Sequence, residues 1–160
     1  MGLDMYLYKK KKQEQEKQIE VVAYWRKANQ IHNWFVENVQ DGIDNCEAYP
    51  VTKTNIELLL KICNEILAID INYDEQLTEV GMSYHDGIKE PIHEFVKIID
   101  DDEAIEQIAR LLPTSPGFFF GSTDYDEYYI EDIKDTVEQL NHVLELTDFE
   151  TEELYYNSSW

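Results

Sequence analysis

The stretch YWRKANQIHNWF occupies residues 24–35 and combines two tryptophans, two cations, two asparagines and one histidine. Read as an α-helix, with about 100° between successive residues, this segment carries one continuous apolar stripe of the kind that packs on a core. The stripe consists of Tyr24, Ala28, Ile31, Phe35 and Val39. We therefore predict a helix from Tyr24 to Val39 with this face buried, ended by Gly42.

A second, mixed stripe lies about 90° around the same predicted helix. It contains Trp25, Asn29, His32 and Val36, and it is bordered on the side away from the core by Arg26 and Asn33. Such side chains can bind a planar ligand by stacking and hydrogen bonding, or anchor a protein partner. They can equally satisfy one another in a polar seam inside the protein. The sequence leaves both interpretations open.

The length and composition predict one folded domain over residues 1–160. A chain of 160 residues buries about two-thirds of its unfolded surface around a single core. The hydrophobic fraction is 43%, and 11 Tyr, 6 Phe and 3 Trp residues argue against disorder despite a net charge of −21. We expect a single globular core.

The charge is distributed unevenly along the chain. Residues 1–27 carry seven cations and four acids, whereas residues 28–160 carry six cations and 30 acids, a net charge of −24. A surface this acidic repels phosphates, so we predict no direct nucleic-acid binding through the acidic body. It attracts basic proteins, including enzymes whose basic channels hold nucleic acid. The alternative is that the acids serve solubility alone.

Targeting, cysteine and metal signals are weak. The sequence lacks an apolar run of 18 residues and an apolar signal core, so we predict a cytoplasmic protein without membrane contact. Cys46 and Cys63 do not form a disulfide framework and are expected to be reduced core thiols. His85 and His93 lack the spacing of a helical zinc site, and we predict neither a metal nor a cofactor.

The first half of the chain is predicted to begin with a hairpin. Strands are expected at residues 2–9 and 19–23, separated by a charged loop over residues 9–18. A short strand or extended turn at residues 47–51 precedes a helix capped by Thr52 or Thr54, with the apolar stripe Ile56, Leu59, Leu60, Cys63, Ile66 and Leu67. Residues 68–91 are interpreted as a loop with little regular structure.

The second half is predicted to be mainly helical. One helix is expected to start at Pro91, with Ile92, Phe95, Val96 and Ile99 as its apolar positions, and another to end at Pro113. Phe118–Phe120 is interpreted as a short strand buried on both faces. Ser122, Thr123 or Asp124 is expected to cap a long helix, and residues 154–160 a final strand. These elements predict an α+β fold in which about four or five helices cover one side of a small, mostly antiparallel sheet.

No catalytic residue can be assigned from the sequence. A phosphate loop is excluded because no Lys follows Gly121-Ser122-Thr123, and no Ser, Cys or Thr has a recognisable base beside it. The candidate site is therefore a binding site. Its predicted members are Trp25, Arg26, Asn29, His32 and Asn33, with Tyr125, Asp126, Tyr128, Tyr129 and Trp160 as companions from other segments.

Several motifs together resemble a group of small proteins encoded in phage and prophage genomes. They are MGLDMYL at the N-terminus, YWRKAN with IH and WF at residues 24–35, LPT at residues 112–114, FFFGST with YDEYY at residues 118–129, and SSW at the C-terminus. The resemblance covers most of the chain outside residues 9–20 and 68–105. It implies an accessory phage protein that acts on host machinery, a class that includes counter-defence inhibitors such as anti-CRISPR proteins.

Three hypotheses of function follow. The first is a non-enzymatic inhibitor that binds a basic, nucleic-acid-acting host defence protein. The second is a small-ligand or nucleotide-binding and sequestering protein whose pocket contains Trp25, Arg26, Asn29 and His32. The third is an enzyme with His32 as its acid or base. The sequence leaves the oligomeric state open.

Overall fold

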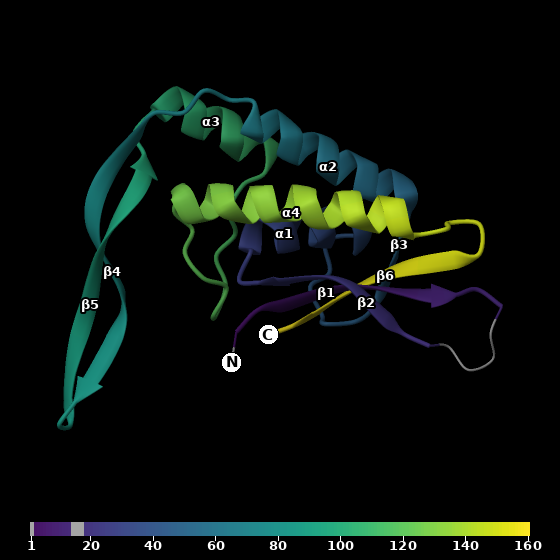
Figure 1. Ribbon diagram of the computed structural model, residues 1–160, viewed down its shortest axis with the longest axis horizontal. Helices are drawn as coiled ribbons and strands as arrows, with labels where there is room; N and C mark the ends of the chain where they lie inside the picture. Colours follow the sequence, from purple (N-terminus) through teal and green to yellow (C-terminus); the bar gives the residue numbers. More distant parts are fainter. Residues whose placement is uncertain (1, 14–17) are drawn as a thin grey trace.

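The computed structural model describes residues 2–13 and 18–160 and has the predicted α+β architecture. A four-stranded antiparallel sheet has the strand order β2-β1-β6-β3, and the helices lie on one of its faces (Figure 1). A separate two-stranded hairpin, β4-β5, stands apart from this body. No helix in the described ranges has the length and apolar character needed to cross a membrane.

The predicted N-terminal hairpin and C-terminal strand are confirmed. Strand β1 (Asp4–Lys11) lies between β2 (Glu20–Arg26) and β6 (Glu152–Ser159). Leu7 is buried against the helices, whereas its neighbour Tyr8 points to the uncovered face and stacks on Tyr155. Strand β1 continues two residues beyond the predicted end because its pairing with β6 extends to Lys11. Of the predicted loop, residues 14–17 lie outside the described residues.

The prediction of a helix beginning at Tyr24 was wrong. Residues 24–26 belong to β2, and helix α1 runs over Asn29–Val39. Strand alternation points Tyr24 to the uncovered face, where it is 43% exposed and donates a hydrogen bond to Asp4 Oδ1 at 2.5 Å. Ala28, Ile31 and Phe35 are buried as predicted. The spacing of Tyr24 from Ala28 matched a helical period by coincidence.

Helices α2 and α3 are confirmed, and α4 begins later than predicted. Thr52 caps α2 (Lys53–Leu67) in a reciprocal capping box with Asn55. Helix α3 (Asp102–Leu111) stops before Pro113. Helix α4 (Glu127–Leu146) is capped by Asp126, which accepts a hydrogen bond from the Tyr129 amide at 3.0 Å, and not by residues 122–124. An isolated bridge between Asp126 and Ile98 keeps the preceding residues extended.

Residues 68–99 differ most from prediction. Strands β4 (Tyr73–His85) and β5 (Ile88–Ile99) form a long antiparallel hairpin in place of the predicted loop and helix. Asp86 and Gly87 both have positive φ and form its two-residue turn. The apolar residues of β5 at positions 92, 95, 96 and 99 also fit a helical period, which explains the wrong prediction. We call residues 73–99 the arm.

Phe118–Phe120 is not a strand. Phe118 is 82% and Phe119 is 45% exposed, and only Phe120 is buried. The short strand expected within residues 47–51 is present as β3 (Tyr49–Val51), which pairs with β6. The two cysteines are free thiols. Cys63 lies in the core, and burial raises the pKa of its thiol to about 12. Cys46 is only partly buried, so the expectation of a core thiol holds for Cys63 alone.

Candidate functional site

The structure places three of the predicted site residues in the interior. Trp25, Asn29 and His32 are each at most 3% exposed. The Trp25 side chain lies between β2 and α4, where its Nε1 donates to Thr136 Oγ1 at 2.9 Å. These side chains are enclosed by the protein's own atoms and do not line an open pocket. They also do not satisfy one another as the alternative interpretation supposed, because each has its hydrogen-bond partners on other elements or loops.

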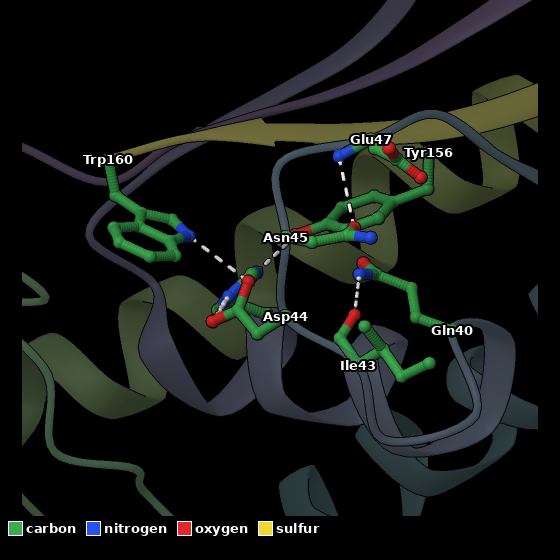
Figure 2. A network of polar contacts seen from close by, with 8 residues as sticks. Gln40, Ile43, Asp44, Asn45, Glu47, Tyr156 and Trp160 are labelled. Atoms are coloured by element: carbon green, nitrogen blue, oxygen red, sulfur yellow. Dashed lines mark hydrogen bonds and ion pairs between the residues drawn. The ribbon is translucent and has the colours of Figure 1, made fainter.

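His32 is the centre of a hydrogen-bonded chain that runs from the core to the surface. Its Nε2 lies 2.9 Å from Asp44 Oδ2, and its Nδ1 lies 2.7 Å from the hydroxyl of Tyr156. Asp44 also accepts a hydrogen bond from Trp160 Nε1 at 3.0 Å (Figure 2). A carboxylate only accepts, so His32 donates from Nε2 to Asp44, and in the neutral imidazole Nδ1 accepts the Tyr156 proton. We call these four residues the polar seam.

The polar seam has a structural role, because its hydrogen bonds are made within the protein. Tyr156 is fully buried, and this burial is the largest cause of its raised hydroxyl pKa, with Asp44 adding to it. Both nitrogens of His32 already have partners inside the protein, which leaves neither for a substrate. His32 therefore lacks the access that an acid or base catalyst needs.

Asn29 holds the loop that carries the three phenylalanines. Its Nδ2 donates to the carbonyl oxygens of Phe120 at 3.2 Å and Ser122 at 2.8 Å. Its Oδ1 accepts from the Ser115 amide at 2.9 Å. One buried amide at the start of α1 thus fixes both sides of a loop about 90 residues away in sequence, which makes Asn29 a positioning residue.

Four other predicted residues do come together. Arg26, Asp126, Tyr128 and Tyr129 line one pocket of ≈ 280 Å³ at the N-terminal end of α4. We call it the Arg26 pocket. Tyr125 packs behind it against Tyr129, with ring centroids 5.2 Å apart, and Trp160 belongs to the polar seam. The ten predicted residues are therefore divided among several environments, and Asn33 is only partly buried on α1.

The Arg26 pocket contains aspartates whose charge is poorly compensated. Burial raises the pKa of Asp132 to about 6, although a hydrogen bond from Gln30 at 3.2 Å lowers it in part. Burial also raises the pKa of Asp126 despite the bond from the Tyr129 amide. Asp124 lies in the same lining, so three carboxylates face a space that also holds Arg26 and Lys27. This balance disfavours a phosphate ligand.

Asp132→Asn is expected to stabilise the protein more at neutral than at acidic pH. The folded-state pKa of about 6 lies above the unfolded value of 3.8, so the charged carboxylate opposes folding above pH 6 and this cost disappears as pH falls toward 4. The gain in unfolding free energy should be larger by about 1–2 kcal/mol at pH 7 than at pH 4. Urea denaturation of both proteins at each pH measures it; an equal gain at both would contradict it.

Sequence reasoning missed two surface features. One is the row of exposed apolar side chains on the arm, signalled by the turn pair Asp86-Gly87 between two β-compatible runs. The other is an acidic row on α4, signalled by successive spacings of four, three and seven residues. We call it the acidic stripe, and it consists of Glu131, Asp135, Glu138 and Glu145.

Within residues 2–13 and 18–160, no group of three or more His, Cys, Asp or Glu side chains is arranged to hold a metal ion. The resemblance to phage proteins stays a prediction. Comparisons of the chain with protein-family models, with curated proteins and with solved structures found no match.

Proposed function

We propose that the chain is a phage-encoded accessory protein that binds and inhibits a basic, nucleic-acid-acting host defence protein without catalysing a reaction. The observation that carries this proposal is the acidic stripe on α4. Its side chains fall within about 80° of one another around the helix and extend over about 21 Å, because each residue advances the helix by about 1.5 Å. A straight row of carboxylates presents to a basic groove the kind of charge array that a phosphate backbone presents.

The acidic stripe has little internal compensation. Glu57 and Glu65 on α2 and Glu106 on α3 each pair with a cation one turn away. In the described part of the chain, none of the four stripe carboxylates forms such an ion pair, and Asp135 only accepts a hydrogen bond from Gln139 at 2.7 Å. Carboxylates that are solvated and unpaired contribute most to attracting a basic partner.

The interior of the predicted site argues against both a nucleotide pocket and an enzyme built on these residues. A nucleotide pocket built on Trp25, Asn29 and His32 would need these side chains open to solvent, and all three are enclosed. The Arg26 pocket is open, but Asp124, Asp126 and Asp132 oppose an anionic ligand there. The small-ligand and enzyme hypotheses therefore have weaker support than a protein partner.

A direct test uses purified nucleic-acid-acting defence enzymes, including CRISPR effector nucleases and restriction nucleases. We expect binding to at least one of them, competition with its nucleic-acid substrate, and an affinity that falls about tenfold or more between about 0.05 and about 0.2 M salt. The proposal would be overturned by an affinity that does not change with salt concentration, or by binding that does not displace the nucleic-acid substrate. Failure to bind any enzyme of the panel would also overturn it.

A further inference from the structure

The arm presents an apolar face to solvent. The strand register places Leu77 opposite Phe95 and Met82 opposite Pro91 on one face, with Tyr84 beyond them. Leu77, Phe95 and Tyr84 are 60%, 72% and 72% exposed. At the base of the arm the body covers both faces, since Val96 on the opposite face is 2% exposed and Ile99 on the same face as Phe95 is 4% exposed. We call the face with Leu77 and Phe95 the outer face.

The hydrogen bonds between the backbone of the arm and the body lie at the base of the arm, in the described part of the chain. The Ile99 amide donates to the Tyr125 carbonyl at 3.1 Å, and the Lys97 amide donates to Glu127 Oε1 at 2.9 Å. Farther along, residues 78–80 line a pocket together with Ser122, Asp124 and Tyr128 of the body. Figure 1 shows the tip of the arm far from the helices and the sheet. A two-stranded ribbon alone is marginally stable, and exposed apolar patches mark binding surfaces.

Each edge of the arm carries a feature that disfavours strand addition. Pro91 removes one backbone donor from β5, and the irregularity between Glu79 and Gly81 breaks the register of β4. Such features hinder pairing with an added strand. The exposed apolar side chains of the outer face therefore offer a better docking surface than the edges.

The charges of the outer face balance, unlike those of the rest of the chain. Register alternation places Glu75, Glu79, Lys89 and Lys97 on this face. Two of the six cations in residues 28–160 thus lie here, in a chain with a net charge of −21. Copies of the chain repel one another through their acidic surfaces, but this face offers both signs to an identical face. A twofold contact pairs each patch with itself, so such a patch is self-complementary.

We propose that the outer face of the arm binds the same face of a second copy, forming a twofold dimer. The apolar residues form the centre of this contact, and the glutamates and lysines lie at its rim, the arrangement found in stable interfaces. A basic partner gains no electrostatic advantage from a charge-balanced face. The attraction of a basic partner is assigned to the acidic stripe, which lies on α4 and takes no part in the dimer. The dimer is therefore independent of the proposed function.

Sedimentation of the full chain over a range of concentrations tests the dimer. We expect a monomer–dimer equilibrium for the wild type and an increase of about 30-fold or more in the dissociation constant for Phe95→Glu, because the charge would be buried at the centre of the contact. The matched control is Ile88→Glu, which should dimerise like the wild type. Ile88 is an apolar residue, 60% exposed, on the opposite face of the same arm.

Leu77→Glu provides a second variant at the facing position of the same cross-strand pair, in case Phe95→Glu disturbs the arm. Added salt should strengthen the dimer, since it screens repulsion between two acidic chains, whereas it should weaken binding of a basic partner. A wild type that stays monomeric up to about millimolar concentration would overturn the proposal, because an association that weak is not a stable dimer. Dimerisation of both Phe95→Glu and Leu77→Glu at wild-type strength would also overturn it.

Discussion

Tyr156→Ala is expected to lower the free energy of unfolding by about 4 kcal/mol, the range for removing a large buried aromatic side chain. The ring of Tyr156 is fully buried and stacks on Phe35, with centroids 4.0 Å apart and planes at 8°. It joins β6 to α1 at the centre of the core. The substitution also removes the hydroxyl that is hydrogen-bonded to His32 Nδ1, which then stays buried without this partner. Urea denaturation followed by circular dichroism measures the loss.

Tyr156→Phe separates the hydrogen bond from the packing. It keeps the ring stacked on Phe35 and removes only the hydroxyl, so we expect a loss of about 1–3 kcal/mol. The matched control is Tyr155→Phe on the uncovered face of the same strand, where a change within about 0.5 kcal/mol is expected. Equal effects at both positions would show that the polar seam does not stabilise the fold.

Local patterns predicted the elements whose signals were unambiguous. Alternation in β1 and the capping residue Thr52 needed no information from distant residues, and both predictions are confirmed. The pattern failed where two periods fitted equally well. Ile92, Phe95, Val96 and Ile99 fit a helix by spacing, although the Asp86-Gly87 turn before them favours a hairpin. At Tyr24, pairing with β1 overrode a helical spacing.

The arrangement of the candidate site was not accessible from sequence. The environment of Trp25 depends on Thr136, 111 residues away, and that of His32 depends on Tyr156, 124 residues away. No local pattern reveals that such partners satisfy these side chains in the interior. The sequence did show that polar and aromatic residues gather around residues 24–35, and the structure shows that Asn29 and His32 use this polarity to fix a loop and a strand.

The triple substitution Glu131→Lys, Glu138→Lys and Glu145→Lys is expected to weaken binding of the proposed basic partner by about 100-fold or more. It reverses three charges of the acidic stripe, all of them exposed and without an ion pair among the described residues. The free energy of unfolding should therefore change little. Calorimetric titration of a partner found in the binding panel measures the change, and circular dichroism checks that the helix content is unchanged.

The control substitutes Glu37, Glu47 and Glu150 by lysine, at exposed positions outside α4. The two triple variants have the same net charge, so the long-range attraction to a basic partner is reduced equally in both. Charges farther than a Debye length of about 8 Å from the contact are largely screened, and the control should weaken binding by about threefold or less. If both variants lost affinity equally, the partner would sense only the total charge of −21, and the acidic stripe would not be its binding surface. A large loss confined to the α4 variant assigns the contact to that helix.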